Sequence, residues 1–314
     1  MRVLGTLLGL LLGVSTASGD IVREVRAAIA RQDLAAAESA LAAYRQQKGD
    51  GLEAILALSW LGRGALAARD FDKAEAYAQE TRELVLAQLK TRELDAERRL
   101  PLALGASIEV QAEVLAARKQ RAEAISFLQQ ELKTYYGTSI RTRIQKNIHQ
   151  LSLEGKAAPS LETRLWLGAP PPGGALPKGR PMLLFFWAHW CGDCKAMAPS
   201  LKRIGQDYET HGLLIVAPTQ RYGYVARGEE ASPEVELNYI ERIRQEHFPA
   251  LEGAPIPVSE ENFRLWGVSS TPTLALADRN GVVRLYHPGE MRYEELAAGV
   301  ERLFGSATAS PAKK

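Results

Sequence analysis

Cysteine is nearly absent from this sequence, since only two of its 314 residues are of that type. Two cysteines exclude a multi-disulfide framework. Charge of one sign is also missing: 39 lysines and arginines stand against 37 acidic residues, so nothing favours nucleic acid as a partner. The composition, with 46% hydrophobic and 24% charged residues, is typical of a soluble globular protein. The length predicts more than one domain.

A long hydrophobic run is missing as well. The mostly apolar segment at residues 3–14 is too short to span a bilayer. Arg2 precedes it and the small residues Ala17, Ser18 and Gly19 follow, as in a signal peptide cleaved before Asp20. A buried first helix is the alternative. No cysteine ends the segment, so we expect no lipoprotein anchor. Residues 1–19 thus predict an exported, periplasmic protein that touches a membrane only while its signal peptide is uncleaved, with its thiols in an oxidising or redox-managed compartment.

The segment 20–153 is predicted to be all helical. It is rich in strong helix formers, and its apolar residues recur at helical spacing. A weak internal echo links "RQDLAAAESAL" at Arg31, "ARDFDKAEAYA" at Ala68 and "ARKQRAEAISF" at Ala117. The stretch from Trp60 to Ala78 resembles a tetratricopeptide repeat (TPR), which implies a degenerate array of helical hairpins. Such an array either recruits a partner or is a packed appendage that adds stability or dimerises, and both interpretations stay open.

The composition changes near Glu154 to Ala157, where prolines and glycines break the helical pattern. Buried strands are expected at 182–189, 212–219 and 255–258, and a hairpin turns at Arg279–Gly281. Helices are expected after the first two of these strands and after the hairpin. This order predicts an α/β domain at 154–305 with a mixed sheet flanked by helices, followed by a disordered tail at 306–314.

Both cysteines lie in "FFWAHWCGDCKAMAP", at the junction between a strand and a helix. The start of a helix stabilises a thiolate and lowers the pKa of the first cysteine. Two intervening residues bring the second sulfur within bonding reach. The pattern therefore predicts Cys191 as the nucleophile and Cys194 as the resolving thiol, with Trp190 shielding the pair.

A metal site is the first alternative for these cysteines, with His189 as a third ligand. No second ligand pair accompanies it, so we expect no metal, and no cofactor besides the redox-active disulfide. Inert structural cysteines are the second alternative, for which a strand-to-helix junction is a poor place.

The same segment resembles the active site of thioredoxin, and "WGVSSTPTLALADRNGVV" resembles the cis-proline strand and hairpin of that family. The flanking segments resemble the TlpA/ResA-like branch of exported thiol–disulfide oxidoreductases. The likeness covers residues 154–304 and implies a thioredoxin-like fold. It also implies that Pro272 follows a cis bond and that the backbone of Thr271 pairs with a client segment.

Two positions depart from the thioredoxin pattern. Gly192 and Asp193 separate the cysteines where thioredoxin has Gly-Pro, and an acid beside a thiolate opposes ionisation. Phe185 stands where thioredoxins have a buried acid. The proton acceptor for Cys194 is therefore not identified from sequence; Gln220 and Arg221 are the polar residues nearest the second strand.

The resemblance implies an exported reductase of protein disulfides, with clients recruited by the helical domain. Its partners would be protein thiols and disulfides, for example apocytochrome c or other periplasmic proteins. The alternative is a non-catalytic TPR-like binding scaffold with a thioredoxin-like module. Reductase, oxidase and isomerase share these residues, so the direction and the electron donor stay open.

Overall fold

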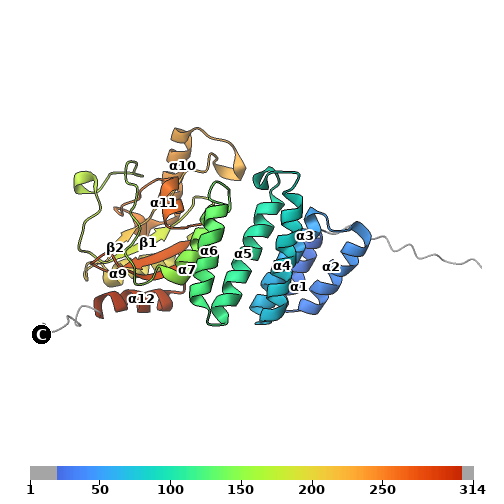
Figure 1. Ribbon diagram of the computed structural model, residues 1–314. Coiled ribbons are helices and arrows are strands. Elements are labelled where there is room, and N and C mark those ends of the chain that lie inside the picture. The colour runs from blue at the N-terminus through green and yellow to red at the C-terminus, as the bar shows by residue number, and fades with distance from the viewer. Residues whose placement is uncertain (1–19, 306–314) are drawn as a thin grey trace, which may run out of the picture. The chain divides into compact units, whose positions relative to one another are not determined.

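The computed structural model describes residues 20–305, so the predicted signal peptide and C-terminal tail lie outside the described residues. The chain divides into two compact units between Val110 and Gln111. Figure 1 shows the helices and strands along the chain. The border predicted at residue 153 is a different division and stays a prediction.

The first unit consists of helices joined by tight turns. They are α1 (Ile21–Ala30), α2 (Leu34–Lys48), α3 (Leu52–Ala67), α4 (Phe71–Gln88), the short η1 (Leu94–Ala96) and the start of α5 (Arg99–Ala117). Buried Val25, Leu41 and Leu58 belong to its core. At Gly62, α3 lies against α4, and a Cβ there would be in ordinary contact with Tyr77 Cβ, 3.6 Å away. This confirms the all-helical prediction for this part of the chain.

The echo in the sequence corresponds to a repeated turn between helices. Gln32 and Arg69 both have a left-handed φ of 61°, and Lys119, in the second unit, has 66°. Asp33 follows Gln32 and Asp70 follows Arg69. Each of these aspartates caps the next helix, because its carboxylate accepts a backbone N–H from the first turn of that helix. The echo therefore marks where one helix ends and the next begins.

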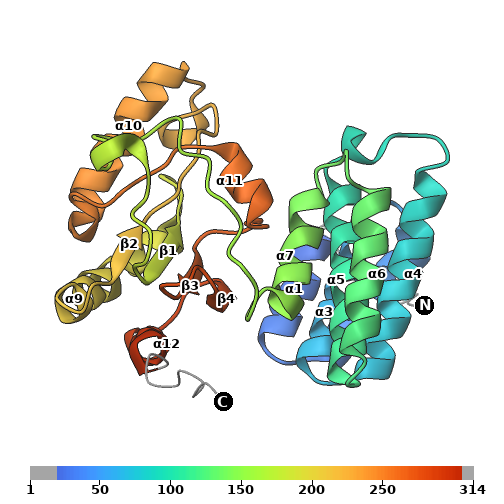
Figure 2. The same cartoon turned by 60° about the vertical axis from the view of Figure 1, so that its left-hand side comes forward.

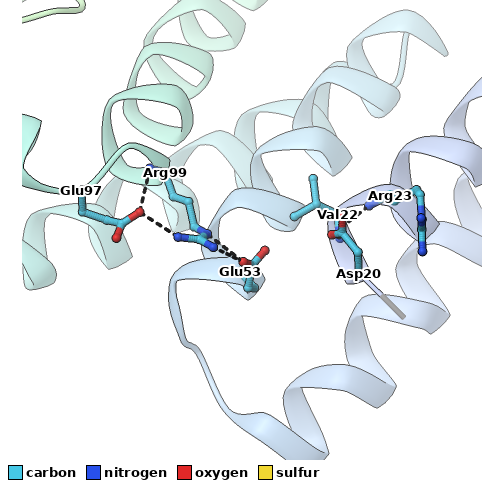
Figure 3. A network of polar contacts seen from close by, with 6 residues as sticks. All are labelled: Asp20, Val22, Arg23, Glu53, Glu97 and Arg99. Atoms are coloured by element: carbon cyan, nitrogen blue, oxygen red, sulfur yellow. Dashed lines mark hydrogen bonds and ion pairs between the residues drawn. The ribbon is translucent and has the colours of Figure 1, made fainter. Parts of the chain in front are cut away.

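Ion pairs and a cap hold the helix starts of the first unit (Figure 3). Arg99, the first residue of α5, donates to Glu53 at the start of α3 over 2.7 Å and to Glu97 over 2.9 Å. Asp20 caps α1 by accepting the Val22 N–H over 3.1 Å. Because these groups are largely exposed to solvent, each of these contacts contributes little to stability.

One helix in the described part of the chain, α5, is long and apolar enough to cross a membrane, with a mean hydropathy of 1.3. More than half of it, 56%, is buried within the protein. That burial is typical of a core helix.

The second unit contains the end of α5, helices α6 (Arg121–Thr134) and α7 (Arg141–Ser152), and a mixed four-stranded sheet (Figure 2). The strands are β1 (Met182–Phe186), β2 (Leu214–Val216), β3 (Thr273–Ala277) and β4 (Val283–Pro288), in the order β2-β1-β3-β4. Strand β1 is parallel to β2 and antiparallel to β3, and β3 pairs with β4 as a hairpin. The remaining elements are η2 (Pro172–Gly174), α8 (Gly192–Ala196), α9 (Ala198–Tyr208), η3 (Ala226–Gly228), α10 (Pro233–His247), η4 (Pro249–Leu251), α11 (Glu260–Leu265) and α12 (Tyr293–Gly305).

Strand β1 is buried on both faces, as its continuous apolar sequence predicts. Leu183 and Phe185 face one core, which α9, α10 and α12 complete with Leu201, Ile240 and Val300. The alternate residues Leu184 and Phe186 face a second core with α11. The sheet is thus covered by helices on both sides, and the predicted mixed α/β fold is confirmed.

Helix α7 packs against the second core. The His149 ring lies 5.6 Å from the Tyr286 ring of β4. The Tyr286 hydroxyl donates to the carbonyls of Trp266 and Gly267, over 2.8 and 3.1 Å. These contacts join β4, α7 and the segment after α11, which leads directly to Pro272.

The strand predicted at 255–258 is present only as irregular pairings. Ala217 and Thr219 donate to the carbonyls of Pro255 and Pro257, each over 3.0 Å, and Leu167 donates to Ile256. Prolines at 255 and 257 lack the N–H groups that a regular ladder needs, so the pairing stays discontinuous.

Candidate active site

The two cysteines form a disulfide at the start of α8. Their Cα atoms are 5.3 Å apart, within the usual range for a disulfide. Cys191 caps α8, and its Sγ accepts the Cys194 N–H over 3.0 Å. Helix α8 ends at Ala196, and α9 starts at Ala198 with Pro199 in its first turn. The helix is interrupted here because proline lacks the backbone N–H that would continue the helical hydrogen bonds.

The exposed fractions of the two cysteines differ slightly. Cys191 is 3% exposed and Cys194 is fully buried, whereas Trp190 beside them is 50% exposed. Gly192 and Asp193 are exposed. Cys191 is therefore the more accessible of the two sulfurs.

The loop that holds Pro272 lies at the end of the sheet where the cysteine segment begins. The Thr271–Pro272 bond is cis. Thr273, the first residue of β3, pairs with Phe186, the last residue of β1. Since the strands are antiparallel, Pro272 precedes β3 at the end where β1 runs into the cysteine segment. Pro272 is buried, and Thr271 is half-buried.

The segment between β1 and the cysteines is fixed to the chain after β2. Trp187 Nε1 donates to the Ala217 carbonyl over 3.0 Å, and the Thr219 hydroxyl donates to the Trp187 carbonyl over 2.9 Å. The Cys191 N–H then donates to the Ala188 carbonyl over 3.1 Å and closes a turn that contains His189 and Trp190. The disulfide is thereby attached to a rigid part of the sheet.

A buried ionisable pair lies beside this turn. His189 and Glu236 of α10 are each 1% exposed on their side chains, and His189 Nε2 lies 3.5 Å from Glu236 Oε1. The Glu236 carboxylate accepts the N–H groups of Tyr222 and Gly223. Burial lowers the pKa of His189, against the opposing effect of the Glu236 charge. The imidazole is therefore neutral at neutral pH while the disulfide is intact.

Sequence reasoning did not find Glu236. Of the polar residues nearest the second strand, Gln220 is half-buried and Arg221 is exposed. The sequence did contain a signal for Glu236. It lies at helical spacing from Ile240 and Ile243, so all three residues share the buried face of α10. An acid within an apolar helix stripe needs buried partners, and here they are the imidazole and two backbone amides.

Within residues 20–305, no group of three or more His, Cys, Asp or Glu side chains is arranged to hold a metal ion. His189, the third ligand considered from sequence, instead has its Nε2 directed to Glu236.

The chain is similar to known thioredoxin-like proteins. Residues 174–303 match the family model of the thioredoxin-like domain. The thiol:disulfide interchange protein DsbE of Xylella fastidiosa is 25% identical over 167 residues, 46% of this chain and 75% of that protein. The thiol-disulfide oxidoreductase ResA of Geobacillus thermodenitrificans is 25% identical over 130 residues, 40% of this chain and 64% of that protein.

Among solved structures, a thiol:disulfide interchange protein DsbE from Chlorobium tepidum is 24% identical, with a TM-score of 0.38, over 48% of this chain and 99% of that chain. Across the curated relatives that it matches, the chain spans from 27% to 75% of their length. The family model and the sequence similarities agree: residues 174–303, which include the Cys191–Cys194 disulfide, form a thioredoxin-like domain that is similar in sequence to the DsbE and ResA thiol–disulfide oxidoreductases.

Proposed function

We propose that this protein is an exported thiol–disulfide oxidoreductase that reduces disulfides of protein clients with the Cys191–Cys194 dithiol. The observation that carries the proposal is the disulfide itself, which lies at the start of a helix with Cys191 as its more exposed sulfur. The relatives named for thiol–disulfide interchange support the same chemistry.

Each sulfur has a distinct role in the proposed reaction. The Cys191 thiolate attacks one sulfur of a client disulfide, which forms a mixed disulfide and releases the other client sulfur as a thiolate. Cys194 then loses its proton and attacks Cys191 Sγ, which restores the protein disulfide and releases the second client thiolate. The amide of Cys194 already donates to Cys191 Sγ over 3.0 Å, and such a bond favours the thiolate in the reduced protein.

Client binding is assigned to the surface around the disulfide. The exposed Trp190 ring meets Tyr222 edge-on, with centroids 5.4 Å apart. Pro272 and Thr271 precede β3 at the same end of the sheet. An extended client segment would lie against these groups with its disulfide above Cys191.

Insulin reduction tests the proposal. With dithiothreitol as the electron source, the protein should accelerate the precipitation of insulin chains. Cys191→Ser should abolish the acceleration. Cys194→Ser, reduced beforehand and then mixed with insulin in the absence of dithiothreitol, should attack once and accumulate as a mixed disulfide that added dithiothreitol releases. A Cys191→Ser variant as active as the native protein would exclude the proposed nucleophile. Inactivity of the native protein would favour the non-catalytic scaffold.

The direction of exchange is set by the reduction potential of the couple. We expect equilibration with glutathione to give a value near that of thioredoxin, about −270 mV, as a reductase requires. A value near that of DsbA, about −120 mV, would identify an oxidant instead.

Recruitment of clients is assigned to the helical segment. The guanidinium groups of Arg26 and Arg63 lie 4.5 and 4.6 Å from the centroid of the half-buried Trp60 ring. This arrangement presents an exposed cation beside an aromatic surface, a combination enriched in protein interfaces. Arg26→Ala should raise KM for a protein client and leave the reduction of a small-molecule disulfide unchanged. Equal KM values would argue against recruitment through this surface.

Export is assigned to residues 1–19, and periplasmic proteins such as apocytochrome c are proposed clients. Fractionation of cells that produce the full chain tests the location: we expect the protein in the periplasm, with an N-terminus at Asp20.

A further inference from the structure

His189 lies close enough to the disulfide to respond to its charge. It is the second residue of the turn that the Cys191 N–H closes on the Ala188 carbonyl. Only Trp190 separates it from Cys191, so the two Cα atoms are at most about 7 Å apart. The His189 side chain is 1% exposed. Because water does not screen buried charges well, a thiolate formed at Cys191 would act strongly on the imidazole.

The surroundings of His189 supply one carboxylate and little else that can stabilise charge. Three tyrosine rings meet the imidazole edge-on, with centroids 5.3–5.6 Å away: Tyr222 and Tyr224 from the loop after β2, and Tyr239 from α10. Glu236 is the acid that faces it, and Lys195 of α8 is the cation whose charge acts on it. Burial raises the pKa of Tyr222 and of Tyr224, so these phenols stay protonated and do not compete for the charge.

The contact between His189 and Glu236 is incomplete while the disulfide is present. His189 Nε2 is buried without a hydrogen-bond partner. It lies 3.5 Å from Glu236 Oε1, longer than an imidazole–carboxylate hydrogen bond. A protonated imidazole would donate an N–H toward this carboxylate, and the two charges would then attract each other directly. His189 Nε2 can therefore take up a proton that would face the Glu236 carboxylate.

We propose that the His189–Glu236 pair takes up one proton when the Cys191–Cys194 disulfide is reduced. The inference rests on the proposed function only in that it concerns the same redox couple. A dithiol of a partner protein supplies two electrons and two protons and becomes a disulfide. Of the two protons, one stays on Cys194 as a thiol and the other goes to His189, while Cys191 becomes a thiolate.

The charges balance in this scheme. Before reduction the site carries the single negative charge of Glu236. Afterwards it carries the thiolate, the imidazolium and the carboxylate, again one net negative charge. When the dithiol later reduces a client, the two protons leave with the two client sulfurs. The pair thus provides a position beside the cysteine segment for the proton that Cys191 does not carry as a thiolate.

The charge state of His189 in the two redox states tests the inference. We would record nitrogen NMR spectra of the full chain at pH 7, oxidised and reduced with dithiothreitol, with His189 assigned by the signals that His189→Gln lacks. We expect the two ring nitrogens of His189 to have the separate shifts of a neutral ring in the oxidised protein. In the reduced protein they should converge to the shared value of imidazolium, together with thiolate absorbance at 240 nm that Cys191→Ser lacks.

Two variants on the same helix sharpen the test. Glu236→Gln keeps the shape of the side chain and removes its charge, and His189 should then stay neutral after reduction. Glu241→Gln, which removes an acid paired with Arg244 one turn further along α10, should leave the native response intact. A neutral His189 in the reduced native protein, an imidazolium in the oxidised protein, or an unchanged response in Glu236→Gln would each overturn the inference. Because dithiothreitol reduces the disulfide directly, this result is independent of whether the protein reduces insulin.

Discussion

Gly267 marks a close approach between α7 and the segment that leads to Pro272. Its φ is +63°, in the left-handed region, and a Cβ built there would lie 2.6 Å from Lys146 N and 2.8 Å from the Gln145 carbonyl carbon. Both are backbone atoms of α7, which cannot rotate away as a side chain would. Substitution by alanine must therefore displace the helix or the segment.

The expected cost has two parts. A non-glycine residue in the left-handed region costs about 1–2 kcal/mol. Forcing a methyl group into a packed site costs a further 1–3 kcal/mol, approximately. Gly267→Ala should thus lower the free energy of unfolding by about 2–5 kcal/mol. Gly253→Ala is the matched control, because Gly253 has a φ of +72° and no atom within 4 Å of its Cβ position. The free energy of unfolding of Gly253→Ala should fall only by the cost of the left-handed backbone, about 1–2 kcal/mol.

Urea unfolding followed by tryptophan fluorescence measures both variants. A Trp60→Phe background confines the signal to the second unit, because the other tryptophans, at 166, 187, 190 and 266, all belong to it. Equal losses in the two alanine variants would refute the reasoning, since they would mean that α7 does not press against Gly267.

Three further predictions concern stability. Burial, with a smaller contribution from Lys156, lowers the pKa of His149 to about 4. The unfolded chain therefore binds the extra proton between about pH 6.5 and pH 4, and native stability should fall by about 3 kcal/mol as the pH drops through that window. Urea titrations at pH 7 and pH 4 measure this loss of stability. It should be smaller by about that amount in His149→Phe, and an equally large loss in the variant would show that His149 is not its source. Tyr286→Phe removes the donor to two buried carbonyls and should cost about 1–3 kcal/mol in the same assay; no loss would mean that solvent satisfies them. Gln32→Gly relieves a left-handed φ of 61° and should stabilise the first unit by about 1 kcal/mol, seen as a higher Tm for the loss of helical circular dichroism; a lower Tm would show that the side chain has a stabilising role.

The elements with a strong local signal were predictable from sequence. The continuous apolar run at Met182–Phe186 gave a buried strand, and Ser232 before Pro233 gave the start of α10. The cysteine segment gave the junction of β1 and α8. In each case neighbouring residues carry the whole signal, through burial of apolar side chains or through capping.

Contacts between distant segments were not predictable in this way. Glu236 and His189 come together only because α10 packs beside the cysteine segment, and neither residue has a sequence neighbour that indicates the other. The three turns at Gln32, Arg69 and Lys119 are an intermediate case. Their similarity was visible, but their shared left-handed backbone was not, because none of the three is a glycine.

The docking of α7 has a practical consequence for anyone who wishes to produce the redox module separately. A fragment that starts at Glu154 would have the complete family signature, yet it would lack His149 and the rest of the helix that covers Tyr286. Helix α11 would still cover part of that side of the sheet, but Tyr286 would lose its contact with α7, and the newly exposed apolar surface would favour aggregation. A starting point upstream of Arg141 keeps this covering helix in the expressed polypeptide.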